Sequence, residues 1–159
     1  MIVRPAEPRD RDALAAFLEE RGAARVARRR ALVDATEHPA LVAEENGRLA
    51  GVLTYVLDGP RRLCEVLTLH AVERRRGVGT ALLADLERIA RAANVHRVWL
   101  ITTNDNVDAL RFYQRRGFRL AAVYPDAVGR SRASLKPEIP ETGEYGIPLR
   151  DEVELWKEL

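Results

Sequence analysis

Arginine and glycine residues lie together in the segment RRRGVGTALL, which spans residues 74–83. Three arginines precede two glycines, and the chain then continues directly into apolar residues at helical spacing. The first turn of a helix has backbone N–H groups without an intrahelical partner, and the helix dipole adds about half a positive charge there. Gly77 and Gly79 lack a Cβ, so a phosphate group can approach the backbone closely. The segment therefore predicts a binding site for a phosphate-containing compound.

Two common glycine-rich loops do not fit this segment. A dinucleotide-binding loop needs a third glycine three residues after the second, but that position is Leu82. A P-loop needs a lysine after its last glycine, whereas Gly79 is followed by Thr80. The segment therefore belongs to neither class of nucleotide-binding loop.

The elements that must position these residues follow from apolar spacing and turn signals. Apolar residues three to four apart predict helices over residues 10–21, 78–93 and 106–116, with a weaker one over 24–35. Residues 39–58 predict two strands joined at Asn46-Gly47, and further strands are predicted over 63–72, 95–103, 118–124 and 150–158. The strand–helix–strand order in the middle predicts a βαβ crossover with parallel strands. The chain is therefore expected to be an α/β protein with a mixed sheet.

Read with its flanks, the arginine–glycine segment resembles the acyl-CoA signature of the GNAT superfamily of N-acetyltransferases. The first block, between an apolar strand and an amphipathic helix, is Arg74-x-x-Gly77-x-Gly79. The second block, with the family's asparagine, helix tyrosine and following Gly-Phe, is Asn106-x-x-Ala109-x-x-x-Tyr113-x-x-x-Gly117-Phe118. The resemblance covers residues 1–124, and the last strand also fits. It implies a GNAT-type α/β fold: a mixed, mostly antiparallel sheet flanked by helices, with a central βαβ unit that binds acyl-CoA.

The resemblance also implies how acetyl-CoA binds. Backbone N–H groups of the family's loop bind the pyrophosphate, and here they belong to Arg75, Arg76, Gly77, Val78, Gly79 and Thr80. The side chains of Arg74 to Arg76 would reach outer phosphates, or else form a solvated basic turn. A bulge would expose strand backbone to the pantetheine arm at Leu67, Thr68 and Leu69. Asn106 and Ala109 would also bind the coenzyme, although Asn106 equally suits a plain helix N-cap.

Two catalytic residues follow from the same resemblance. Tyr113 would protonate the thiolate that leaves when an amine attacks the thioester, with a core aromatic residue as the alternative. Glu65, or a water that it holds, would take the proton from the amine, although a structural pairing with an arginine is an equal alternative. By simple alternation Glu65 points with Leu63, Leu67 and Leu69, unless the family's bulge breaks that pattern.

Three other residues bear on the mechanism. His70 is a second candidate base because of the usual pKa of an imidazole, or else a bystander at the strand end. Some relatives use a glutamate on the following strand, where this chain has Ile101, so that version of the mechanism is excluded. Cys64 is interpreted as a small buried hydrophobic residue, because direct transfer needs no cysteine nucleophile.

Two segments are candidates for selecting the acceptor. Residues 125–149 are expected to form a long, proline-containing loop over the acceptor side, where Asp126, Glu138, Glu141 or Glu144 would meet a cationic amine. Residues 25–30, RVARRR, suit a solvated helix face. If these arginines line the acceptor cleft instead, an acidic acceptor is favoured over a polyamine. The sequence leaves both open.

The composition excludes several classes of protein. The 159 residues suit one domain over 1–159, and the formal net charge is only +2, without the basic, aromatic-rich stripe of a nucleic-acid-binding protein. One cysteine and three unclustered histidines argue against a metal site. Without an apolar span or signal peptide pattern we expect no membrane partner and a cytoplasmic location.

The resemblance to the GNAT superfamily implies an N-acetyltransferase that moves an acetyl group from acetyl-CoA to a primary amine in a ternary complex. The acceptor is a small molecule or a peptide, with a small molecule preferred. The alternative is a non-catalytic module that senses acyl-CoA, which the missing acid at Ile101 favours slightly. Family members are often dimers, so the terminal strand over 150–158 is expected to pair either across a homodimer interface or within the sheet of its own chain.

Overall fold

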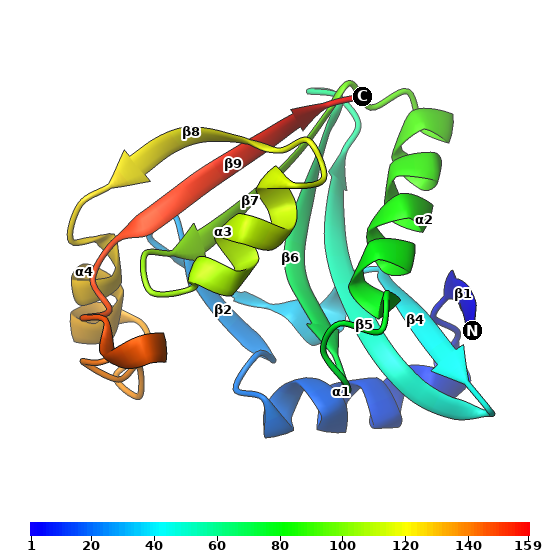
Figure 1. Ribbon diagram of the computed structural model, residues 1–159, viewed down its shortest axis with the longest axis horizontal. Helices are drawn as coiled ribbons and strands as arrows, with labels where there is room; N and C mark the ends of the chain where they lie inside the picture. The colour runs from blue at the N-terminus through cyan, green and yellow to red at the C-terminus, as the bar shows by residue number, and fades with distance from the viewer. The chain divides into compact units, whose positions relative to one another are not determined.

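The computed structural model describes residues 1–159, which form two compact units interleaved along the sequence (Figure 1). Unit 1 comprises Met1–Val26, Asp34–Val98 and Leu159, and unit 2 comprises Ala27–Val33 and Trp99–Glu158. The single domain expected over residues 1–159 thus contains two units, each with its own strands and helices.

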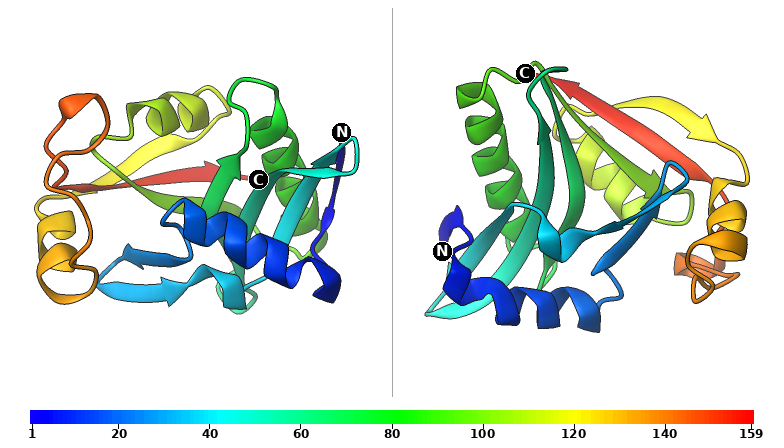
Figure 2. Two further views of the ribbon diagram at one scale, coloured as in Figure 1. Left: turned by 90° about the horizontal axis from the view of Figure 1, so that it is seen from below. Right: turned by 180° about the vertical axis from the view of Figure 1, so that it is seen from behind.

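Unit 1 is a four-stranded antiparallel arrangement with a helix on each face. Its strands are β1 (Ile2–Pro5), β4 (Ala40–Glu45), β5 (Arg48–Asp58) and β6 (Leu63–Ala71), in the order β1-β4-β5-β6. Its helices are η1 (Pro8–Asp10), α1 (Arg11–Glu20), η2 (Ala35–Glu37) and α2 (Val78–Ala92). Figure 2 shows α1 and α2 on opposite sides of these strands.

The apolar stripes of the two helices explain this layering. α1 buries Leu14, Phe17 and Leu18 in a cluster with Val42 and Val52 of the strands. α2 buries a second stripe, whose members are Val78, Leu82, Leu83, Leu86 and Ala90. Because successive strand residues face opposite sides, β4 and β5 supply apolar side chains to both helices.

The hairpin between β4 and β5 is the one that the sequence predicts. Asn46 and Gly47 join the strands, with φ angles of 51° and 71°. Both residues lie in the left-handed region that a type I′ turn requires, which asparagine and glycine adopt at little cost. The predicted pair of strands over residues 39–58 is therefore confirmed.

Unit 2 contains the elements that follow the crossover. They are β7 (Arg97–Thr103, of which Arg97 and Val98 belong to unit 1), α3 (Val107–Gln114), β8 (Arg119–Tyr124), α4 (Ala127–Ser134), η3 (Glu144–Gly146) and β9 (Glu152–Glu158). The strand order is β7-β9-β8, with β8 and β9 antiparallel. The terminal strand thus pairs with a strand of its own chain.

A short hairpin replaces the helix predicted over residues 24–35. β2 (Arg25–Arg28) and β3 (Ala31–Asp34) form a two-stranded sheet, and the turn residues Arg29 and Arg30 have φ angles of 48° and 63°. The prediction was wrong because arginine and alanine favour helices locally and the turn has no asparagine or glycine. Within unit 2, the Arg29 N–H donates to Glu152 Oε1 at 3.0 Å, a contact that local propensity does not contain.

Residues 125–149 are more ordered in structure than a loop. They include the eight residues of α4, the short η3 and a bridge between Thr142 and Pro148. The Arg132 guanidinium stabilises this segment, because it donates hydrogen bonds to the backbone oxygens of Ile139, Pro140 and Leu149. The prediction of one long loop therefore missed a helix, whose sequence AVGRSRAS has no apolar stripe.

The fold class predicted from the sequence, a mostly antiparallel mixed α/β arrangement flanked by helices, is confirmed. The parallel pairing of the two crossover strands stays a prediction. No helix has the length and apolar character needed to cross a bilayer.

We expect Gly51→Ala to destabilise the protein by about 1–3 kcal/mol, because the new methyl group overpacks the contact between β5 and α2. A Cβ at Gly51 would lie 2.6 Å from Val78 Cγ1 and 2.9 Å from the backbone oxygen of His70. Urea denaturation measures the change in the free energy of unfolding. Gly59→Ala is the matched control, since a Cβ there meets no atom within 4 Å. Equal stability of the two variants would contradict this account of the packing.

Candidate functional site

The arginine–glycine segment forms an exposed loop that leads into α2. Gly77 is the N-cap of α2 with φ 81°, and Arg75 has φ 66°, so two of three consecutive loop residues are left-handed. The N-cap residue Gly77 makes no side-chain hydrogen bond to the first turn, where the N–H groups of a helix have no intrahelical partner. The 15-residue helix directs its dipole at this loop. The loop therefore has the backbone geometry of an anion site.

The arginines of the loop differ in their surroundings. Arg76 bonds Glu73 at 3.0 Å and lies 3.5 Å from Glu45, which raises the pKa of its guanidinium. Its charge is therefore partly compensated by carboxylates of the protein itself. Arg74 and Arg75 are exposed.

The predicted bulge is present in the pairing of β5 with β6. Thr54 pairs with Thr68, but Tyr55 pairs with Val66, so Leu67 has no partner on β5. The Thr54 and Thr68 hydroxyls hydrogen-bond at 2.7 Å directly beside the shift. The backbone of Leu67, Thr68 and Leu69, the segment expected to bind pantetheine, therefore includes the bulge.

The bulge changes the direction of Glu65. Glu65 pairs with Val56, which shares a face with Thr54, so Glu65 lies on the face of Thr68 rather than that of Leu67 and Leu69. Strict alternation along β6 was therefore the wrong rule here. The Glu65 side chain is buried, with 5% of its surface exposed, and it has an interaction partner within the protein. His70 lies on this same face of β6.

Tyr113 is a buried phenol within unit 2. It projects from α3, and its ring makes edge-to-face contacts with Phe112 and Phe118 at centroid distances of 5.1 and 5.2 Å. Burial raises the pKa of Tyr113 above its usual range. The hydroxyl group carries its proton at neutral pH, as any tyrosine does and as a general acid must. The core-aromatic role and the acid role are compatible in this setting.

Asn106 caps α3, as the plain structural interpretation predicts. Its side-chain oxygen accepts the Ala109 N–H at 3.2 Å.

Cys64 is fully buried, and burial raises the pKa of its thiol to about 12, which suits a small core residue. The candidate coenzyme residues of the loop and β6 lie in unit 1, whereas Asn106, Ala109 and Tyr113 lie in unit 2.

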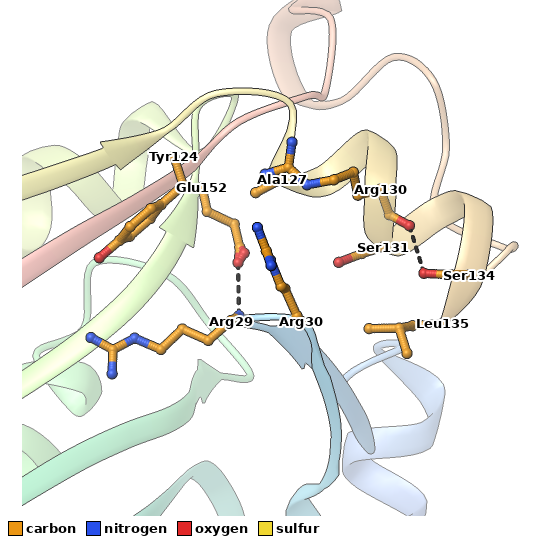
Figure 3. Close-up of a pocket in the computed structure, with 9 residues that line it drawn as sticks. All are labelled: Arg29, Arg30, Tyr124, Ala127, Arg130, Ser131, Ser134, Leu135 and Glu152. Atoms are coloured by element: carbon orange, nitrogen blue, oxygen red, sulfur yellow. Dashed lines mark hydrogen bonds between the residues drawn. The ribbon is translucent and has the colours of Figure 1, made fainter.

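Unit 2 contains a cavity of about 640 Å³ that the sequence does not reveal (Figure 3). The β2–β3 turn, α4 and the ends of β8 and β9 contribute its lining, which consists of Arg29, Arg30, Tyr124, Ala127, Arg130, Ser131, Ser134, Leu135 and Glu152. The basic run at residues 25–30 was the one signal for it. Glu152 and the α4 residues were missed, because nothing in the sequence places β9 and α4 beside that run.

A buried carboxylate holds the β2–β3 turn in unit 2. Glu154, 2% exposed, binds the Arg29 guanidinium and accepts the indole N–H of Trp156 at 2.8 Å. The Arg29 guanidinium also stacks on the Trp99 ring, 4.1 Å from its centroid. The arginine run is therefore not a solvated helix face: Arg29 is fixed by β9, and Arg30 follows it into the cavity lining.

None of the four acidic residues proposed for a cationic acceptor lines the cavity; they are Asp126, Glu138, Glu141 and Glu144. Glu141 pairs with Arg132 at 3.3 Å, and the Glu144 N–H donates to Asp105 at 2.9 Å. Asp126 is the N-cap of α4. The suggestion that these carboxylates select the acceptor stays a prediction. No group of three or more His, Cys, Asp or Glu side chains is arranged to hold a metal ion.

Comparison with known proteins identifies the family. The family model described as Acetyltransferase (GNAT) family matches residues 8–118. The uncharacterized protein YdhI of Bacillus subtilis (strain 168) is 50% identical over 109 residues, which are 69% of this chain and 66% of YdhI. The uncharacterized protein YxbD of the same organism is 43% identical over 115 residues, 72% of this chain and 70% of YxbD. The chain thus spans slightly less than two thirds of YdhI.

Solved structures share the fold at low sequence identity. The IAA acetyltransferase from Bacillus cereus ATCC 14579 has a TM-score of 0.72 at 23% identity, with 99% of each chain covered. A Bacillus subtilis acetyltransferase in complex with CoA has a TM-score of 0.71 at 21% identity, covering 99% of this chain and 97% of that one. A GNAT family acetyltransferase from Elizabethkingia anophelis with acetyl-CoA bound has a TM-score of 0.68 at 20% identity, with the same coverage.

We expect His70→Gln to make the protein less sensitive to acid. Burial, with smaller contributions from Arg21 and Arg74, lowers the pKa of His70 below its ordinary value of 6.5. Below that value the unfolded chain takes up a proton that the folded chain resists, so the free energy of unfolding falls with pH until the folded pKa is passed. Urea denaturation at about pH 7.5 and about pH 5.5 measures this loss, which the variant should reduce. The exposed His96, replaced in the same way, is the control, and equal losses in all three proteins would contradict the expectation.

Proposed function

Because the chain belongs to the acetyltransferase (GNAT) family, we propose that it transfers an acetyl group from acetyl-CoA to a primary amine. One observation carries the proposal beyond the family assignment. The loop expected to bind pyrophosphate has left-handed residues at Arg75 and Gly77 and leads into α2, whose N-cap residue makes no side-chain hydrogen bond to the first turn. This is the arrangement that a bound pyrophosphate needs.

The coenzyme-binding residues are those of the two sequence blocks and the bulge. Backbone N–H groups from Arg75 to Thr80 bind the pyrophosphate, and Arg74 contributes charge. The bulge at Leu67 leaves strand backbone free of a β5 partner, which supports its use by the pantetheine arm. The side-chain oxygen of Asn106 keeps the hydrogen bond from the Ala109 N–H. The side-chain nitrogen of Asn106 is then the atom that contacts the coenzyme.

The reaction is a direct transfer in a ternary complex. The amine nitrogen attacks the acetyl carbonyl carbon, the C–S bond breaks, and the sulfur leaves with the electron pair. Tyr113 donates a proton to that sulfur, and Glu65, directly or through water, accepts the proton that the amine releases. The products are the N-acetylated acceptor and the free thiol of coenzyme A, so protons and electrons balance.

Burial supports these two roles in different ways. The phenol of Tyr113 carries its proton at neutral pH as any tyrosine does, and burial raises its pKa further. Glu65 lies on the side of β6 to which the bulge turns it, next to the Thr54–Thr68 hydrogen bond. A structural role of Glu65 predicts the same burial, so only kinetics separates the two. The cavity of about 640 Å³ lies in the size range of small-molecule sites, which supports a small-molecule acceptor over a peptide.

The proposal is tested by measuring thiol release from acetyl-CoA with a panel of amines. The panel contains amino acids, polyamines, aminoglycosides and peptides with a free N-terminus. Release with at least one class supports the transferase. Stabilisation against heat by acetyl-CoA without release from any amine would instead support a non-catalytic acyl-CoA sensor.

We expect Tyr113→Phe to reduce kcat by about a hundredfold or more, because the leaving thiolate loses its proton donor. The dissociation constant of acetyl-CoA should stay nearly unchanged, since the ring contacts with Phe112 and Phe118 need no hydroxyl group. Tyr145→Phe removes the same group from an exposed tyrosine and serves as the control. An unchanged kcat would remove Tyr113 from the mechanism.

Glu65→Gln should lower kcat/KM for the amine and leave acetyl-CoA binding intact, because the amide cannot accept the proton. The control is Glu87→Gln, another buried glutamate of unit 1, which pairs with Arg91. Stopped-flow detection of the released thiol, with each variant shown to be folded, separates an effect on the reaction rate from an effect on the stability of the protein. Normal kinetics together with a lower unfolding midpoint would assign Glu65 a structural role only.

A further inference from the structure

Two arginines without a carboxylate partner line the cavity of unit 2. Arg30 follows Arg29 at the tip of the β2–β3 hairpin, and Arg130 lies in α4, a hundred residues further along the chain. Neither guanidinium forms an ion pair or hydrogen bond with the protein, although Arg29 beside them is paired with Glu154. Figure 3 shows the Arg30 side chain rising toward Ala127 at the start of α4, where the Arg130 side chain also ends.

The backbone that presents Arg30 is unusual for its residue type. Arg29 and Arg30 have φ angles of 48° and 63°, a region in which residues other than glycine cost about 1 kcal/mol or more. The turn is held in this form by Glu152 Oε1, which accepts the Arg29 N–H, and by the pairing of Arg29 with Glu154. Glycine or asparagine would make this turn without strain. Arginine there supplies a positive side chain to the cavity instead.

Glu152 provides an independent observation that points to a ligand. It lines the same cavity, and only 3% of its surface is exposed. One oxygen accepts the Arg29 N–H, but the other, Oε2, is buried and has no hydrogen-bond partner. A buried carboxylate oxygen without a donor costs free energy that a donor on a bound molecule would recover.

The arginine pair and the unpaired oxygen of Glu152 suit different groups of a single ligand. A pair of guanidinium groups matches the planar oxygens of a carboxylate or the oxygens of a phosphonate. An unsatisfied carboxylate oxygen matches an N–H or O–H donor. The remaining lining combines hydroxyl groups with apolar side chains, from Tyr124, Ala127, Ser131, Ser134 and Leu135, so it suits a compact molecule with an apolar part beside its acidic group. A polyamine is disfavoured because three arginines line the cavity against one glutamate.

We infer that this cavity binds the acidic group of the acceptor amine, so that the substrate class is amines that carry a carboxylate or phosphonate, such as amino acids. Arg30 and Arg130 bind the acidic group, and Glu152 Oε2 accepts a hydrogen bond from a donor on the same molecule. The inference rests on the proposed acetyl transfer, which it refines by naming the acceptor.

The test compares matched pairs of amines in the thiol-release assay. Glycine, L-methionine and L-phenylalanine are each measured beside their carboxamides, and 2-aminoethylphosphonate beside ethanolamine. The amine of a carboxamide is less basic and therefore more often neutral, so intrinsic reactivity favours the amide. We expect kcat/KM to favour the acidic member of at least one pair by about tenfold or more.

Three variants assign that preference to the cavity. Arg30→Gln and Arg130→Gln should each abolish the preference, measured as the ratio of kcat/KM for the acidic amine to kcat/KM for its neutral partner. Arg119→Gln, which removes an exposed arginine of unit 2 outside the cavity, should keep the preference. Equal rates for acids and amides, or a preference that survives both cavity variants, would overturn the inference.

A second readout separates this inference from the proposed function. If no amine releases thiol, acetyl transfer to amines fails, and the cavity is then judged by binding alone. The heat-unfolding midpoint is measured with each amino acid and with its amide. A rise that only the acids cause, and that Arg30→Gln abolishes, supports an acid-binding cavity without transfer. The absence of any such rise overturns the cavity assignment as well.

Discussion

Leu67 has no partner on β5, and the side chains of β6 before it face the opposite side from the one that strict alternation would give. Because of this register shift, the residues of β6 before Leu67 and those after it follow different alternation patterns. Beyond the shift, Leu69 stays opposite Leu53 in regular pairing, whereas Glu65 is turned to the side of Thr54 and Thr68. The hydrogen bond between the two threonine hydroxyls fixes the position of the shift. A strand without it would bury Glu65 among the leucines, where a charged side chain is costly.

The loop before α2 depends on the same strands through Gly51. The close approach of Val78 to Gly51 leaves no room for a side chain, and it places the start of α2 against β5 beside the backbone of His70. The helix N-terminus is therefore set by packing that lies outside the signature motif. Arg75 and Gly77 then complete the turn in left-handed conformations. The backbone geometry of the proposed anion site thus depends on both the loop sequence and the packing beneath it.

In unit 2 the corresponding constraint is the carboxylate pair on β9. Glu152 and Glu154 are both buried, and both bind Arg29, one through its backbone and the other through its side chain. They hold an arginine-rich turn in a conformation that its own residues do not favour. Buried carboxylate oxygens almost always accept a hydrogen bond. Glu152 Oε2 is an exception, because it is buried and has no hydrogen-bond donor. The same strand therefore holds the turn in place and supplies the carboxylate of the proposed ligand site.

The sequence by itself determined the features that depend on neighbours in the chain. The Asn46-Gly47 turn, the amphipathic stripe of α2 and the family indicated by the two signature blocks depend on residues that are close in the chain, and each was predicted correctly. The N-cap at Asn106 was one of the two roles that the sequence left open for that residue. The tertiary structure alone decided the features that depend on distant residues. Local propensity favoured a helix over 24–35, but Glu152 and Glu154, more than a hundred residues away, stabilise a hairpin there. The direction of Glu65 depended on a bulge whose position is set by the partner strand. The cavity was invisible for the same reason: its arginines and its glutamate come from separate segments, and only the packed chain brings their charges together.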